Sequence, residues 1–260
     1  MQRFDAESLR MIIGGHAVSD FNRLPAPKRK AILTRHLVHT EAVVIGPGPL
    51  LRRWWRKNDG KPEEPDKQLR NEACEIYYGE NTFIVTLGML WEFLKHLLSH
   101  DEEDFSVAPL VGTILVDLIL VDLKKERDFY MVDIESRLED LFLFTHAKQI
   151  TLRLVGGRTF DGMDTAGHEL MHCVEESVER LIWKFGLRFD IKKCPEGREA
   201  EARSIKYYWS PPTEETKQRV EEGIGSFKDI TQVEIAYRME DLRSDEQRER
   251  GLERRLSLSE

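Results

Sequence analysis

Residues 69–85, LRNEACEIYYGENTFIV, contain the patterns of a helix, a turn and a strand in direct succession. Apolar residues recur at helical spacing over residues 67–77, which predicts a helix with one buried side. The tetrapeptide YGEN at residues 78–81 contains a glycine and an asparagine, both of which tolerate left-handed backbone angles, so the helix is predicted to end there. The β-branched and aromatic residues 82–85 then predict a strand. We interpret the stretch as an architectural corner of the fold rather than as a binding site.

Helical and strand-like patterns continue to alternate along the chain after this corner. Further helices are predicted over residues 87–98, 134–144, 165–185 and 213–223. Further strands are predicted over residues 113–123, 149–155, 187–192, 205–209 and 232–238. This alternation predicts an α/β fold, with α+β as the alternative, in which helices cover a single mixed sheet. The units resemble leucine-rich repeats, but their spacing never settles to about 20 to 29 residues, so we expect an irregular fold and not a clean solenoid.

The chain divides into five predicted segments. A helix over residues 25–38 and a strand over residues 39–45 precede Gly46-Pro47-Gly48-Pro49, which no regular element can cross. The predicted segments are an N-terminal extension (1–20), a short helical segment (21–45), a loop (46–66), the α/β domain (67–239) and a charged tail (240–260), the last expected to be disordered or a solvated helix.

The composition limits the classes of partner. The 260 residues include 39 Lys and Arg against 47 Asp and Glu, for a formal charge of -8. A net negative charge argues against a general binder of nucleic acid or acidic membrane, and no apolar run approaches the roughly 20 residues of a membrane span. The basic aromatic cluster at residues 52–57 is a weak exception. Three cysteines without a CxxC motif favour a reducing compartment, so we expect a cytoplasmic or nuclear protein.

Two segments resemble known families. Residues 24–37, LPAPKRKAILTRHL, are similar to the opening of an F-box, in which a Leu-Pro pair precedes spaced apolar residues and a short helix. Residues 69–85 resemble a segment shared by a large set of fungal F-box-like proteins, most of which have no assigned biochemistry. The order of the two segments also fits that family.

The resemblance implies a protein-interaction function without a cofactor. Leu24, Pro25, Ile32 and Leu37 would match the apolar positions that dock on the Skp adaptor of a cullin-RING ubiquitin ligase, and the later region would bind an unknown protein substrate. One feature departs from the family pattern. Where an acidic and an aliphatic residue usually follow Leu-Pro, this chain has Pro27 and Lys28.

A second motif points to different chemistry. Residues 168–172, HELMH, match HExxH, in which His168 and His172 would lie on one helix face and bind zinc while Glu169 acts as general base. Zinc catalysis needs a third protein ligand, and Glu196, Glu199 and Glu201 are candidates. The metzincin continuation is excluded because Glu175 and Val178 stand where Gly and His are required. The alternative function is therefore a zinc-dependent metallopeptidase-like hydrolase, and the competing interpretation is a solvated helix face.

Overall fold

A computed structural model describes residues 10–46, 64–95, 107–119, 134–156, 165–195, 197, 201–226 and 228–237. Within these ranges it does not describe the side chains of residues 64–67, 95, 165–170, 172 and 173. The chain forms two compact units. The first comprises Met1–Leu118, Ser136–Arg153 and Leu187–Phe189, and the second comprises Ile119–Glu135, Leu154–Gly186 and Asp190–Glu260.

A single mixed sheet of six strands confirms the predicted α/β fold. The strands follow one another across the sheet in the order β1-β2-β3-β4-β5-β6. Their bounds are Val43–Ile45 (β1), Thr82–Thr86 (β2), Thr113–Ile119 (β3), Gln149–Val155 (β4), Phe189–Cys194 (β5) and Arg203–Ser204 (β6). The first three strands are parallel, whereas β6 runs antiparallel to β5. Parallel strands require crossover connections, and α5 and α6 lie between the first three strands in the chain.

Alternate residues of the strands in the first unit form the core. Phe83 and Val85 of β2 lie in register with Ile114 and Val116 of β3, and all four are fully buried. Because side chains of a strand alternate between faces, the intervening residues lie on a second face, which is less covered. This second sheet face contains Val44, Thr82, Ile84, Thr86, Thr113, Leu115 and Asp117.

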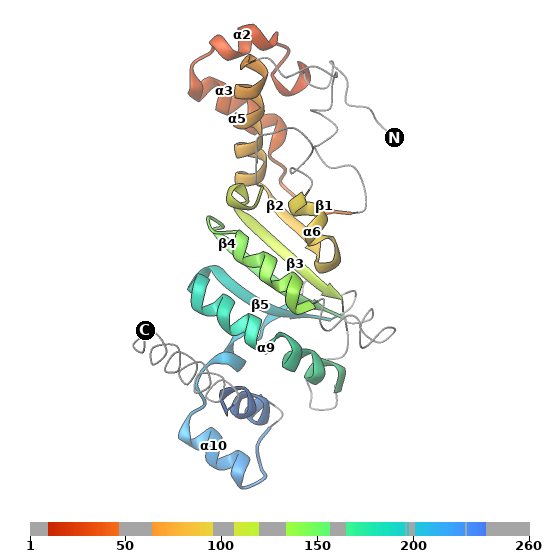
Figure 1. Ribbon diagram of the computed structural model, residues 1–260, viewed down its shortest axis with the longest axis vertical. Coiled ribbons are helices and arrows are strands. Elements are labelled where there is room, and N and C mark those ends of the chain that lie inside the picture. Colours follow the sequence, from red (N-terminus) through yellow and green to blue (C-terminus); the bar gives the residue numbers. More distant parts are fainter. Residues whose placement is uncertain are drawn as a thin grey trace, which may run out of the picture. The chain divides into compact units, whose positions relative to one another are not determined.

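The N-terminal part of the first unit contains the helices α2 (Val18–Arg23), α3 (Ala26–Leu37) and α5 (Glu64–Glu80). Both α2 and α3 pack on α5 (Figure 1). The buried positions of α3 are Arg29, Leu33 and Leu37, which recur every four residues and so form one stripe. Helix α6 (Leu87–Lys95) follows β2 directly and packs on it, and the short 3-10 helices η1 (Ala108–Leu110) and η2 (Asp140–Leu143) precede β3 and β4.

The second unit contains α9 (Thr165–Phe185), a helix of 21 residues at the predicted position. Met171, Val174, Val178, Leu181 and Phe185 are buried and form one apolar stripe along this helix. A short 3-10 helix, η3 (Gly186–Arg188), connects α9 to β5, so the strand begins two residues later than predicted. The unit also contains η5 (Lys206–Trp209) and α10 (Glu214–Glu221), whose N-terminus is capped by the Thr213 hydroxyl.

Several predicted elements are wrong. Where a strand over 205–209 was expected, Lys206–Trp209 form the 3-10 helix η5, and residues 228–237 are helical where a strand over 232–238 was expected. The helix predicted to end at residue 77 continues through Gly79 to Glu80, and Gly79 has no left-handed φ. The N-terminal strand covers only Val43–Ile45. The basic aromatic cluster at residues 52–57, the ends of the helix and strand predicted over 96–98 and 120–123, and the tail 240–260 lie outside the described residues.

Candidate partner-binding surface

The predicted docking residues lie at and after the corner between α2 and α3. Pro25 is the N-cap residue of α3, with φ -57° and ψ 140°, and it is exposed, while the Leu24 N–H caps α2 by donating to the Phe21 carbonyl. Leu24 and Ile32 are half-buried. Leu37 is only 2% exposed and belongs to the core stripe of α3. The surface available to a partner therefore consists of Leu24, Pro25 and Ile32, without Leu37.

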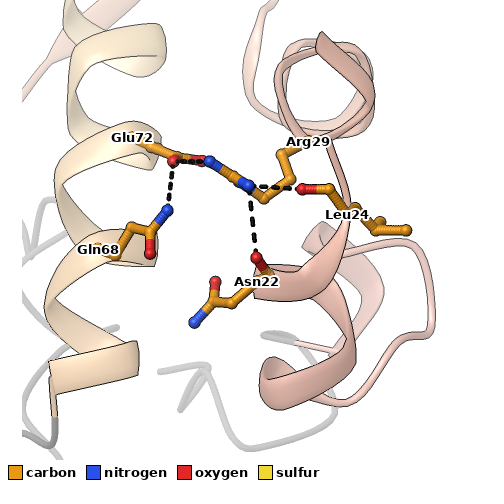
Figure 2. A network of polar contacts seen from close by, with 5 residues as sticks. All are labelled: Asn22, Leu24, Arg29, Gln68 and Glu72. Atoms are coloured by element: carbon orange, nitrogen blue, oxygen red, sulfur yellow. Dashed lines mark hydrogen bonds and ion pairs between the residues drawn. The ribbon is translucent and has the colours of Figure 1, made fainter. Parts of the chain in front are cut away.

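A network of polar contacts around Arg29 holds this corner in place (Figure 2). The guanidinium donates to both carboxylate oxygens of Glu72 on α5, at 2.8 Å (Nε to Oε2) and 2.5 Å (Nη2 to Oε1). Its remaining nitrogen, Nη1, donates to the backbone carbonyls of Leu24 at 2.6 Å and Asn22 at 3.4 Å. Arg29 thus connects the last turn of α2, the docking residue Leu24 and α5. A bidentate geometry of this kind is available to arginine and not to lysine.

The ion pair is partly desolvated, with side-chain exposures of 10% for Arg29 and 26% for Glu72. The hydrogen bonds from Arg29 hold the pKa of the Glu72 carboxyl below its ordinary value, against the opposing effect of burial, and a further bond from Gln68 adds to this shift. Glu72 is therefore ionised at neutral pH and fixed from two sides.

Asn81 fixes the other end of α3. Its amide nitrogen donates to the Leu37 carbonyl at 2.9 Å and to the Tyr77 carbonyl at 2.8 Å, while its side-chain oxygen accepts from the His39 N–H at 2.7 Å. The side chain is 1% exposed, so these bonds satisfy both its donor and acceptor groups away from water. Asn81 therefore joins the C-termini of α3 and α5, a role that differs from the turn residue predicted from the sequence.

The second sheet face contains a bidentate ion pair of its own. Arg153 of β4 donates to Asp117 of β3 at 2.6 Å and 2.7 Å. Beside it, Val44, Ile84 and Leu115 lie in register across three strands, and Val44 is 70% exposed. The face thus combines an apolar row with a neutralised pair of charges and threonine hydroxyls, which is a chemistry suited to a protein segment rather than to a highly charged ligand.

The HELMH motif lies on α9, as the sequence predicts. The side chains of His168, Glu169 and His172 are outside the described part of the structure, as are Glu196 and Glu199. Glu201, the third candidate ligand, is exposed. Among the described residues, no group of three His, Cys, Asp or Glu is arranged to hold a metal ion. The zinc site stays a prediction.

Sequence reasoning did not find the long-range contacts of Arg29, Glu72, Asn81, Asp117 or Arg153. A signal existed only for Arg29, which occupies a position of the apolar stripe of α3 four residues before Leu33. A charged residue on the buried side of a helix requires a buried partner, and that requirement points to an ion pair without naming its second member.

A comparison of the chain with family models, with curated proteins and with solved structures finds no match. Of the helices in the described ranges, none is both long and apolar enough to cross a membrane.

Proposed function

We propose that this chain is a protein-interaction protein that acts as an F-box-like substrate adaptor of a cullin-RING ubiquitin ligase. The corner formed by Leu24 and Pro25, together with Ile32, would dock on a Skp-type adaptor. The second sheet face, with its apolar row of Val44, Ile84 and Leu115, would bind the protein substrate.

One observation carries the proposal. Arg29 donates to the Leu24 carbonyl and is itself held by Glu72 of α5, so the backbone of Leu24 is fixed. Pro25 stays exposed, and Leu24 and Ile32 stay half-buried. Apolar side chains held in a fixed geometry lose little conformational entropy on binding, so they suit a docking surface. The resemblance of residues 24–37 to an F-box supplies the identity of the partner.

Co-purification of the full chain with a Skp-type adaptor tests the proposal. We expect the adaptor to bind the wild-type chain and to be lost from the double variant Leu24→Asp, Ile32→Asp. Asn71→Asp is the matched control, because Asn71 is exposed on α5 and its substitution should leave binding unchanged. Thermal unfolding of each variant separates lost binding from lost folding. Absence of the adaptor from the wild-type complex, or equal binding by a folded double variant, would contradict the ligase proposal.

The second candidate is a zinc-dependent hydrolase in which His168 and His172 bind the metal and Glu169 is the general base. It is supported by α9 being one helix across the motif, since residues four apart then share a face.

A further inference from the structure

The N-terminal part of the chain has the opposite charge to the whole. Residues 10–46 contain six Lys and Arg against two Asp and Glu, in a protein with a formal charge of -8. Helix α3 contains no acidic residue. A local concentration of one charge in a protein of the other sign produces a surface field that selects partners and speeds their association.

The cations of α3 divide into two sets by position. Arg29 faces inward, where Glu72 neutralises it. Lys28, Lys30 and Arg35 are exposed, and among the residues that the structure describes no carboxylate pairs with any of them. The outward cations are therefore available to a partner, whereas the inward one is already used within the fold.

Two of the exposed cations, Lys28 and Arg35, flank the docking residue Ile32. On a helix, Lys28 and Arg35 are the neighbours of Ile32 at positions i−4 and i+3. Ile32 is half-buried, and it lies close to Gly14, since a Cβ atom placed on that glycine would be 3.3 Å from the Ile32 Cγ2. An apolar side chain between two cations is complementary to a partner surface that presents an apolar residue between carboxylates.

We propose that the outward face of α3 formed by Lys28, Ile32 and Arg35 binds an acidic protein surface. This inference rests on the proposed function and names the chemistry of the adaptor surface that would contact the corner. Two cations beside an apolar residue suit a protein surface, which can present an apolar side chain between its carboxylates, better than the continuous phosphates of a nucleic acid or an anionic membrane. Pro27 stands where an acidic residue usually follows Leu-Pro and Lys28 where an aliphatic residue does, so this surface lacks a negative charge and has a positive one instead.

Charge reversal tests the inference. The variant Lys28→Glu, Arg35→Glu should bind a Skp-type adaptor at least about tenfold more weakly than wild type, and the wild-type affinity should fall as salt rises from about 50 to 300 mM. The matched control Lys148→Glu, Arg203→Glu makes the same change in net charge at exposed positions elsewhere and should bind as wild type does. An adaptor that binds the α3 variant as tightly as wild type would overturn the inference and leave the proposed function standing.

A second probe separates the two failures. If the adaptor does not bind the wild-type chain, the ligase proposal fails, and a fluorescent Glu-rich peptide with interspersed leucines then tests α3 directly. Salt-sensitive binding of the peptide by wild type and the control, but not by the α3 variant, supports an acidic partner. No binding of the peptide, or preferential binding of duplex DNA or anionic vesicles, overturns it.

Discussion

Gly79 and Gly112 bring the last turn of α5 into direct backbone contact with the start of β3. The Gly112 N–H donates to the Tyr78 carbonyl at 3.0 Å, and the Gly112 carbonyl accepts from the Lys148 N–H at 2.7 Å. A Cβ atom at Gly112 would overlap the carbonyl oxygen of Gly79. Glycine is therefore required at residue 112 by close approach, and not by a left-handed backbone angle.

Gly112→Ala should lower the free energy of unfolding by about 2 kcal/mol or more, because the atoms that would have to move are backbone atoms of a helix. Gly46→Ala is the control, since a Cβ there meets nothing within 4 Å and φ is not left-handed. Urea denaturation measures both, and the control should stay within about 0.5 kcal/mol of wild type. Equal stabilities of the two variants would show that α5 can shift away from β3 at little cost.

Arg29→Met should destabilise the first unit by roughly 3 kcal/mol, since it leaves the Glu72 carboxylate partly buried without its bidentate donor. Lys30→Met removes a neighbouring exposed cation and should change stability by less than about 0.5 kcal/mol. A double-mutant cycle with Glu72→Gln isolates the pair itself, and a coupling energy near zero would mean that the Arg29 bonds to Leu24 and Asn22 carry the effect.

The stability of the protein should fall in acid in a way that depends on Glu72. Its pKa in the folded state lies below the ordinary value of 4.5, so its contribution is fully present above that value and is lost as pH falls through the lowered pKa. The free energy of unfolding, measured by denaturation at several pH values between pH 6 and pH 3, should therefore fall less for Glu72→Gln than for wild type. Glu75→Gln, at an exposed position of the same helix, should retain the wild-type slope.

Asn81→Asp tests the connection between α3 and α5. The carboxylate can still accept from the His39 N–H, but it cannot donate to the Leu37 and Tyr77 carbonyls, and the new charge is buried. We expect a loss of about 3 kcal/mol, compared with about 0.5 kcal/mol or less for Asn71→Asp on the exposed side of α5. A small loss of stability for both variants would mean that the Asn81 hydrogen bonds do not hold the C-terminus of α3 in place.

Zinc content distinguishes the alternative function. Elemental analysis of the purified full chain should give one zinc per chain if HELMH is a metal site, and His168→Ala should remove it. His36→Ala, an exposed histidine on α3, should not change the metal content in either case. Wild-type protein that contains no zinc and takes up none on dialysis against it would end the hydrolase proposal.

The fold was predicted well for the longer elements with one regularly buried face and poorly for the short segments 205–209 and 228–237, although Ile205, Tyr208, Val233 and Ile235 are buried there as well. Strands β2, β3 and β4 and helix α9 follow their apolar periodicity closely. Residues 232–237 alternate polar and apolar side chains as a strand does, yet they are helical. The overlooked signal lies upstream: Asp229 accepts from the Ser226 N–H at 2.8 Å while the Ser226 hydroxyl accepts from the Asp229 N–H at 3.3 Å, a reciprocal capping pair that begins a helix.

The candidate surface was predicted only in part, because its residues depend on long-range pairs. Leu24, Pro25 and Ile32 stand out as a local motif, whereas the partnership of Arg29 with Glu72 joins residues that no local pattern relates. Leu37 illustrates the limit of motif transfer: its position fits the F-box pattern, but its place on the stripe with Arg29 and Leu33 makes it a core residue. The four-residue periodicity of α3 alone indicates that Leu37 belongs to the buried stripe.

The sequential order of the strands also affects how the chain can fold. Each strand adds to the sheet beside the one that precedes it in the sequence, so the pairings of β1 with β2 and of β2 with β3 need no residue that follows Ile119. Low sequence separation between contacting elements favours rapid folding, and domains emerging from the ribosome fold from the N-terminus. The Arg29 and Asn81 contacts can therefore form while the second unit is still being synthesised.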